Sequence, residues 1–171
     1  GEITTAHPAT RGTTRRASCD VLVIGAGAAG LAAARELAGQ DVSVIVVDEN
    51  ARVGGTLGYR YDVDGSAQGL LREALAVLGE APRVRLMTGT CAVGCYADRT
   101  VALASPEGLV VVQARSIIVA TGAVEQPAVF HNNDLPGVML ASAAERLVRR
   151  YAVAPCARAV LLAGNADAYG A

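Results

Sequence analysis

The sequence predicts an α/β fold in three layers, with a parallel sheet in the middle, helices on one face and a β-meander on the other. Its 171 residues suit one domain with one core, and 52% of them are hydrophobic although only 4% are aromatic. Continuous apolar runs alternate with segments of helical periodicity, which is typical of buried parallel strands joined by helices. A later stretch, about 90–113, breaks into short apolar runs separated by turn residues, which indicates the meander.

The first half of this pattern contains two strands and two helices. Residues 21–24 and, after Ser43, the rest of 43–47 are continuous apolar runs, as expected for strands that are buried on both faces. Residues 28–37 form an alanine-rich helix between them, and residues 66–79 carry leucine and alanine at helical spacing. The segment 49–65, which joins the second strand to the second helix, is a glycine-rich loop.

The second half returns to the sheet after the meander. A short strand is expected at 84–87 before the meander, and a buried strand at 116–120 after it. A helix is expected at 142–151, with Ser142 opening a capping box in its first turn. The apolar run at 158–163 predicts one more strand.

A glycine motif lies where the first strand meets the first helix. It reads G-x-G-x-x-G, which is weak evidence alone but specific when it follows a buried strand and opens a helix. Gly25 permits the tight turn, Gly27 lets the backbone approach a pyrophosphate, and Gly30 lets the helix pack closely on the strand. The helix N-terminus directs its N–H groups and partial positive charge at the phosphates. The motif residues predicted to bind a dinucleotide are Gly25, Ala26, Gly27, Ala28, Ala29 and Gly30.

An acidic pair follows the second strand. Asp48 comes eighteen residues after Gly30, at the position where a carboxylate accepts hydrogen bonds from the ribose of an adenosine half. A carboxylate there disfavours the 2′-phosphate of NADP. The alternative is that Asp48 and Glu49 simply end a strand in solvent. Because packing does not by itself require a carboxylate at this point, the nucleotide-binding interpretation is preferred.

Two further glycine-containing segments belong to the candidate site. One follows the acidic pair and offers bare backbone to a nucleotide, together with an arginine that could reach a phosphate or the adenine face. The other ends the later buried strand. Taken singly, each is an ordinary turn, and only their combination with the glycine motif carries weight. The residues concerned are Arg52, Gly54, Gly55 and Thr56 in the first segment and Ala120, Thr121 and Gly122 in the second.

Composition argues against several other functions. The net charge of −1 gives no electrostatic case for a nucleic acid or a membrane surface. All fifteen basic residues are arginine, so a mechanism that needs a Schiff-base or P-loop lysine is excluded. The four cysteines form no C-x-x-C pair and indicate reduced thiols, hence a cytoplasmic location. His131 is a loop histidine without a partner set, so we predict no catalytic residue and no metal site in this chain.

The order of strand, glycine motif, acid, Gly-Gly, meander and Ala-Thr-Gly resembles the dinucleotide-binding domain of the two-dinucleotide-binding flavoproteins, over residues 20–164. This resemblance implies a Rossmann-like fold that binds FAD or NAD(P), with the backbone near Ala92 facing the adenine. A narrower resemblance lies in ATGAVEQPAVFHNNDLPGVMLASAAERLVRRYAVAP, residues 120–155. This stretch is similar to the α subunit of heterotetrameric sarcosine oxidase, and in part to opine oxidase and hydrogen cyanide synthase subunits.

The resemblance bears on the cofactor and the partners. In the sarcosine oxidases the α-subunit site holds NAD, while the β subunit carries the FAD that oxidises the amine and FMN lies at the subunit boundary. In the relatives, the equivalent site can hold FAD. NAD and FAD share the ADP half, so the residues leave both cofactors open, and the resemblance favours NAD. It also implies that the partners are other subunits of a hetero-oligomeric oxidase and that the chain is an internal segment.

The resemblance also divides the chain into parts. Residues 1–18 lack periodicity and are expected to be a linker or arm, residues 19–157 form the dinucleotide-binding domain, and residues 158–171 begin a truncated second nucleotide-domain-like segment. In that segment, Ala166 and Tyr169 stand where a second glycine motif would have glycine. We therefore expect one dinucleotide site in this chain.

Three functional hypotheses follow. The first is the dinucleotide-binding portion of a sarcosine-oxidase-like oxidoreductase that acts on secondary amines. The second is part of an FAD-dependent, NAD(P)H-linked reductase, which would need an intact second glycine motif. The third is a non-catalytic scaffold protein. Because the redox end of either cofactor needs surfaces that this chain does not supply, the isolated chain is not expected to be active.

Overall fold

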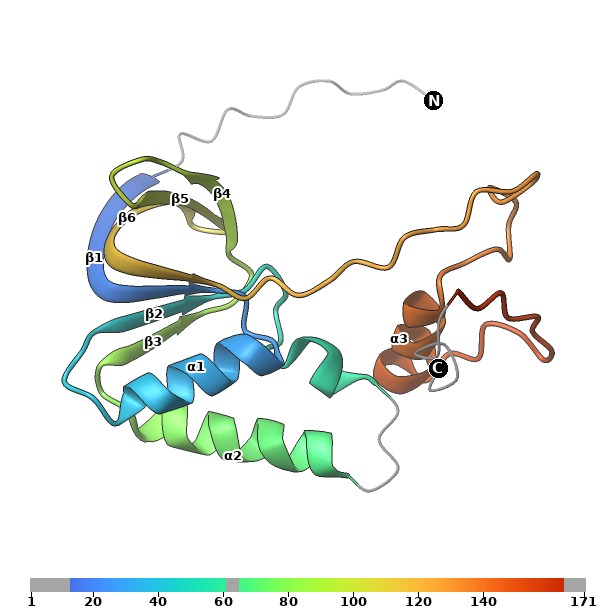
Figure 1. Ribbon diagram of the computed structural model, residues 1–171, viewed down its shortest axis with the longest axis horizontal. Helices are drawn as coiled ribbons and strands as arrows, with labels where there is room; N and C mark the ends of the chain where they lie inside the picture. The colour runs from blue at the N-terminus through green and yellow to red at the C-terminus, as the bar shows by residue number, and fades with distance from the viewer. Residues whose placement is uncertain (1–12, 61–64, 165–171) are drawn as a thin grey trace.

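The computed structural model describes residues 13–60 and 65–164, and Figure 1 shows how their elements are arranged. A six-stranded sheet runs in the order β3-β2-β1-β6-β5-β4. Helices α1 and α2 lie side by side against one face of its parallel part (Figure 1). The elements are β1 (Thr13–Ile24), α1 (Ala28–Ala38), β2 (Val44–Val47), the 3₁₀ helix η1 (Gly55–Gly58), α2 (Ser66–Glu80), β3 (Val84–Met87), β4 (Cys91–Cys95), β5 (Thr100–Ser105), β6 (Gly108–Val119) and α3 (Ala141–Tyr151).

The parallel part of the sheet is buried on both faces, which explains its continuous apolar strands. β2 pairs in parallel with β1 and β3, and β1 pairs in parallel with β6. Within β2, Val44 and Val46 belong to the hydrophobic cluster that includes Leu31 of α1. Ile45 and Val47 belong to the second cluster, on the meander side. The predicted α/β architecture, with helices and meander on opposite faces, is confirmed.

The meander layer arises because two long strands take part in both layers. β4, β5 and the first half of β6 pair in antiparallel fashion. β1 and β6 are each 12 residues long, and they curve so that β5 and β4 lie over the parallel part (Figure 1). The strand expected at 116–120 is therefore the end of a continuous strand, and the two hydrophobic clusters lie on either side of β1 and β2.

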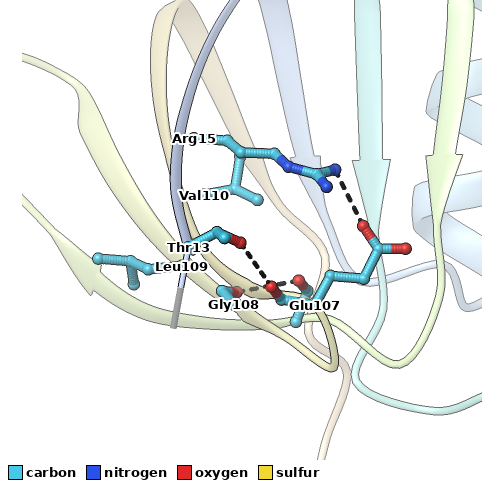
Figure 2. Close-up of a pocket in the computed structure, with 7 residues that line it drawn as sticks. Thr13, Arg15, Glu107, Gly108, Leu109 and Val110 are labelled. Carbon is cyan, nitrogen blue, oxygen red and sulfur yellow. Dashed lines mark hydrogen bonds and ion pairs between the residues drawn. The ribbon is translucent and has the colours of Figure 1, made fainter. Parts of the chain in front are cut away.

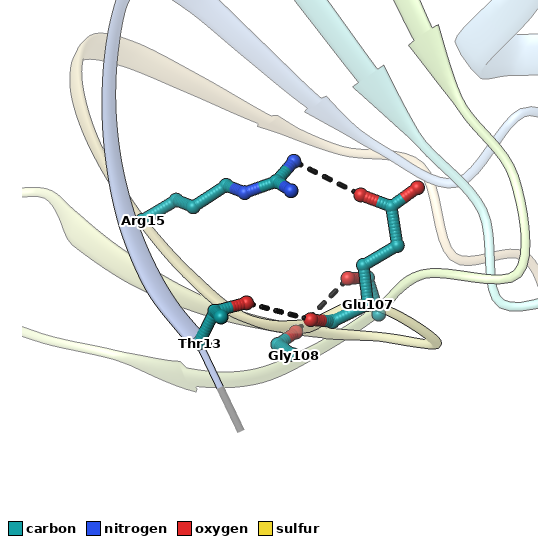
Figure 3. A network of polar contacts seen from close by, with 5 residues as sticks. Thr13, Arg15, Glu107 and Gly108 are labelled. Carbon is teal, nitrogen blue, oxygen red and sulfur yellow. Dashed lines mark hydrogen bonds and ion pairs between the residues drawn. The ribbon is translucent and has the colours of Figure 1, made fainter. Parts of the chain in front are cut away.

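The segment 13–18, predicted as part of a linker or arm, is the beginning of β1 instead. Its backbone pairs with β6 from Gly108 onwards. The Thr13 hydroxyl donates to the carbonyl oxygen of Glu107 over 2.8 Å, and Arg15 pairs with the Glu107 carboxylate over 2.9 Å (Figures 2 and 3). These side chains are exposed, so the strand leaves no hydrophobic period in the sequence. The partner of Thr13 lies 94 residues further along the chain, beyond the reach of a local pattern.

The strand predicted at 158–163 is also wrong. The structure assigns no strand to these residues, and Val160 and Leu162 are 101% and 73% exposed. An apolar run becomes a strand when a neighbouring strand completes its hydrogen bonds. Within residues 13–60 and 65–164, no strand pairs with this run.

Helix α3 confirms the helix predicted near the C-terminal end, but its first turn is capped differently. Its N-cap residue is Leu140, and no capping bond comes from that side chain. The carboxylate of Glu125 instead accepts hydrogen bonds from the N–H groups of Ala141 and Ser142, over 3.3 and 3.0 Å. The Ser142 N–H, with help from its hydroxyl, holds the pKa of Glu125 below its ordinary value. The capping box predicted to open at Ser142 is therefore wrong.

Two sequence-level expectations concern membranes and thiols. Among the described residues, no helix is long and apolar enough to cross a membrane. All four cysteines are free thiols. Burial raises the pKa of the Cys19 thiol, which lowers its reactivity.

Candidate dinucleotide site

Two glycines of the G-x-G-x-x-G motif are required by the packing of the fold itself. Gly25 has a φ of +103°, and a Cβ there would overlap the carbonyl oxygen of Ala120. A Cβ on Gly30 would overlap the carbonyl oxygen of Gly25. Both positions therefore need glycine whether or not any ligand binds.

Gly27 differs from these two positions. Its φ of −80° suits any residue, and a Cβ there would meet only the Cα of Gly55, at an ordinary 4.0 Å. It is the N-cap residue of α1, where no side chain supplies a capping bond and the first turn carries no acidic residue. Ala28 and Ala29 follow it as small, exposed residues. Packing thus leaves open space at Gly27, at the electropositive end of α1.

Asp48 has a structural use that the sequence did not indicate. Its side chain is buried, with 8% of the residue exposed. Oδ2 accepts a hydrogen bond from the N–H of Ala26 over 2.7 Å, and Oδ1 accepts from the N–H and the side-chain amide of Asn50 over 2.8 and 3.0 Å. The carboxylate therefore ties the glycine motif to the end of β2. Packing does require a carboxylate here, contrary to the expectation from sequence, while Glu49 beside it is exposed.

The Gly54-Gly55 turn lies directly against the glycine motif. Gly54 has a φ of +109° and donates its N–H to the carbonyl oxygen of Ala26 over 2.8 Å. Gly55 has a φ of +52°, and a Cβ there would lie 3.1 Å from the Cα of Gly27. Two backbones without side chains thus meet at one point. Arg52 and Thr56, on either side of this turn, are exposed.

The Ala-Thr-Gly segment borders the same loop. The N–H of Ala120 donates to the carbonyl oxygen of Ile24 over 2.8 Å, which continues the pairing of β6 with β1. A Cβ on Gly30 would also lie 3.4 Å from the Cβ of Ala120, so the Ala120 methyl group faces Gly30. Thr121 is exposed, and so is Gly122, which has a φ of +75°. The structure therefore brings this segment and both glycine turns together.

Ala92 approaches the site less directly. It lies in β4 and packs against the meander-side cluster. Two residues earlier, Thr90 donates its N–H to the carbonyl oxygen of Asp48 over 2.8 Å. This contact places the start of β4 beside the acid, while Ala92 itself pairs with Leu103 of β5.

Sequence reasoning missed two features of this region. Asn50 completes the Asp48 network, and the Asp-x-Asn pattern, in which a carboxylate accepts from the N–H two residues on, was the available signal. Tyr59 is the other, with 7% of the residue exposed. The guanidinium of Arg146 in α3 donates to its hydroxyl over 3.0 Å and lies 4.8 Å from its ring centre. No sequence pattern links these residues, because they are 87 positions apart.

Two hollows in the surface lie elsewhere. The hollow drawn in Figure 2 has a volume of about 10 Å³, enough for one water. A larger groove of about 400 Å³ runs between the start of β1 and β3, lined by Arg15, Arg16 and Arg85 among others. Neither is lined by a predicted dinucleotide-site residue. Within the described part of the chain, no three potential metal ligands gather.

The sequence and the fold of this chain are similar to those of known oxidoreductases. The family described as pyridine nucleotide-disulphide oxidoreductase matches residues 19–163. The chain belongs to this family. Three sarcosine oxidase α subunits are similar to it at 35–37% identity, so the predicted resemblance to these proteins is confirmed.

Individual relatives show how much of each protein is shared. The sarcosine oxidase α subunit of Corynebacterium sp. (strain P-1) is 37% identical over 168 residues, which cover 88% of this chain and 17% of that one. An opine oxidase subunit from Rhizobium meliloti (strain 1021) is 33% identical over 150 residues, covering 84% of this chain and 33% of that one. The crystal structure of L-proline dehydrogenase from P. horikoshii superposes with a TM-score of 0.74 at 27% identity, covering 84% of this chain and 30% of that one. The chain spans well under half of each.

Proposed function

We propose that this chain binds the ADP half of one dinucleotide, NAD or FAD, as part of an oxidoreductase that resembles sarcosine oxidase. The observation that carries the proposal is the contrast among the motif glycines. Packing accounts for Gly25 and Gly30, but it leaves a glycine at Gly27 unexplained, because a Cβ would fit the protein there. A pyrophosphate that must come close to the backbone of Gly27 explains why this position is glycine.

Each part of the site has a proposed role. The N–H groups at the start of α1 and the bare backbone of Gly27 and Gly55 would face the pyrophosphate. Oδ1 of Asp48 already accepts two hydrogen bonds from Asn50, but Oδ2 accepts only one, from Ala26, so Oδ2 can hold the glycine motif and still accept from a ribose hydroxyl, with Glu49 beside it. Arg52 and the backbone near Ala92 are proposed to border the adenine.

The reaction class is proposed from the relatives. Three similar proteins are named after sarcosine, opines and proline. All three compounds are secondary amines. A bound nicotinamide or flavin supplies hydride transfer. This chain's own residues would hold and orient the cofactor and exclude water from the phosphates. Several relatives are named as subunits, which supports partner subunits of a hetero-oligomeric oxidase. A cytoplasmic location is proposed from the cysteines alone. NAD is preferred to FAD in this chain because of the similarity to sarcosine oxidase.

One observation favours the scaffold alternative. Asp48 has a packing role in the absence of any ligand, so its presence alone does not distinguish a nucleotide site from a structural turn. The distinction therefore depends on Gly27, which packing does not require.

The test compares two glycine-to-alanine variants at opposite ends of α1. Gly27→Ala adds a methyl group where the phosphates would approach, and Gly39→Ala adds one where nothing lies within 4 Å. We expect both variants to unfold like the wild type, and Gly27→Ala alone to weaken ADP-ribose binding by at least about tenfold in calorimetry. Mass spectrometry of the copurified cofactor then distinguishes NAD from FAD. Equal ADP-ribose affinity in all three proteins would contradict the role given to Gly27, and no ADP-ribose binding by the wild type would favour the scaffold.

A further inference from the structure

Helix α3 lies apart from the hydrophobic core of the described chain. None of its residues is buried, and the segment that leads to it, residues 121–139, is exposed or nearly so throughout. Figure 1 shows α3 at the end of this arm, beyond η1 and away from the sheet. The helix does not pack into either hydrophobic cluster.

Among the described residues, one contact of α3 is centred on Tyr59. This residue lies at the C-terminal end of η1 and is buried. Arg146 donates to the Tyr59 hydroxyl over 3.0 Å, and the guanidinium groups of Arg146 and Arg150 lie 4.8 and 5.7 Å from the ring centre. Both distances are within the range of cation–π attraction. One buried aromatic ring is thus contacted by two cations from successive turns of α3.

Tyr59 is joined to the glycine motif by a short series of backbone contacts. Its N–H donates to the carbonyl oxygen of Thr56 over 3.1 Å, and the N–H of Leu57 donates to the carbonyl oxygen of Gly54 over 2.9 Å. The N–H of Gly54 in turn donates to the carbonyl oxygen of Ala26 over 2.8 Å. The Gly54-Gly55 turn and Tyr59 therefore belong to one hydrogen-bonded unit that touches the glycine motif at one end and α3 at the other.

We infer that Tyr59 is a positioning residue that couples α3 to the Gly54-Gly55 turn, so that a dinucleotide at the glycine motif and the docking of α3 strengthen one another. The inference rests on the proposed function, because it requires that the phosphates lie at Gly27 and Gly55. Coupling of this kind is reciprocal: if docked α3 improves ligand affinity, bound ligand must stabilise docked α3 by the same factor. The coupling should therefore change the affinity for ligands that carry the phosphates, and not the affinity for adenosine.

The experiment uses the full chain and four variants. Tyr59→Leu removes the ring and the hydroxyl, and Tyr59→Phe removes the hydroxyl alone. Arg146→Gln removes one cation, and Arg72→Gln is its control, since Arg72 is an exposed arginine of α2 and not of α3. Hydrogen exchange is followed in residues 54–58 and 141–151, and affinities are measured for ADP-ribose and for adenosine.

We expect Tyr59→Leu to speed exchange in both segments and to weaken ADP-ribose binding by about tenfold, within the usual range for coupled sites, while adenosine binding changes less than about twofold. Tyr59→Phe and Arg146→Gln should fall between Tyr59→Leu and the wild type, and Arg72→Gln should match the wild type. In the wild type, ADP-ribose should slow exchange in 141–151, and in Tyr59→Leu it should not. Loss of affinity for both ligands together would indicate general damage and overturn the inference.

The failure of the inference is distinguishable from that of the proposed function. Suppose that the wild type binds ADP-ribose but that the exchange rates in 141–151 change neither with the ligand nor in Tyr59→Leu. The coupling is then overturned, while the proposed dinucleotide site is still supported. If the wild type binds neither ADP-ribose nor NAD nor FAD, the proposed function is overturned, and the ligand half of this inference with it. The contact between Tyr59 and α3 is then judged by the exchange rates alone.

Discussion

The glycine-motif region and the C-terminal segment are held in opposite ways. At Gly25 and Gly30, main-chain atoms come so close that a single added methyl group would overlap backbone, and the Gly54-Gly55 turn lies directly against the same loop. From Thr121 to Gly164 no residue is buried, and the side chains that contact α3 or reach out from it include Glu125, Arg146 and Arg150. The first region depends mostly on close contacts between main-chain atoms, with the Asp48 carboxylate added, and the second depends on exposed side chains. Substitutions should therefore act on the two regions through different mechanisms.

The largest effect is expected from Gly30→Ala. The new Cβ would overlap the carbonyl oxygen of Gly25, which is backbone and cannot rotate away, so the loop or α1 must shift. We expect a loss of more than about 4 kcal/mol of unfolding free energy, or no folded protein at all. Urea unfolding followed by circular dichroism measures it. The control is Gly39→Ala at the far end of the same helix, where a Cβ meets nothing within 4 Å. Similar stabilities for the two variants would contradict the close-packed description of this region.

A smaller effect in the same region is expected from Asp48→Asn. The amide keeps one oxygen, so it can accept from either Ala26 or Asn50, while its NH₂ group faces a donor. We expect a loss of about 1–3 kcal/mol without any ligand present, the usual cost when a buried donor loses its acceptor. Denaturant unfolding of the ligand-free protein measures it.

The control for Asp48→Asn is Glu49→Gln on the adjacent exposed residue. That change should stay within about 0.5 kcal/mol of the wild type, as surface substitutions usually do. If Asp48→Asn also has no effect without ligand, the carboxylate serves only a ligand, and the structural role derived from its hydrogen bonds is wrong.

The sequence predicted correctly those elements that depend on interactions between residues close together in the chain. The strands predicted at 21–24 and 43–47 and the helix predicted at 28–37 are confirmed, because burial on both faces and helical periodicity leave a pattern within a few residues. Segment 13–18 was misjudged because its strand is made by a distant partner and carries exposed side chains. The role of Asp48 was only half foreseen, since its position was evident but its bond to Ala26 depends on how two loops meet.

The C-terminal segment was less predictable for the same reason. The capping of α3 by Glu125 joins residues 16 and 17 positions apart across an irregular arm, and no local rule connects them. The apolar run 158–163 has the composition of a strand, yet composition does not supply a partner. The bond from Arg146 to Tyr59 crosses from one region to the other, and neither residue type signals it.

The smallest effect is expected in the C-terminal segment, from Glu125→Gln. The variant keeps an acceptor oxygen but loses the charge that favours the positive end of α3. Because this site is exposed, we expect no more than about 0.5 kcal/mol, at the lower end for capping residues, and confined to the first turn. Amide exchange at Ala141 and Ser142, corrected for intrinsic rates, should rise while exchange in β2 stays unchanged. A change spread over the whole sheet would mean that α3 is integral to the core.

The same carboxylate predicts the pH response of this segment. The Ser142 N–H and hydroxyl hold the pKa of Glu125 below its ordinary value of 4.5, so the charged form is the one that the folded helix favours. Its stabilising contribution is then complete above pH 4.5 and is lost as the pH falls through the lower, folded-state pKa. Protection of Ala141 and Ser142 should fall in that acid range in the wild type and stay flat in Glu125→Gln. The four residues of β2 are all apolar, so a parallel acid response in Val44–Val47 would show that the two regions do not separate.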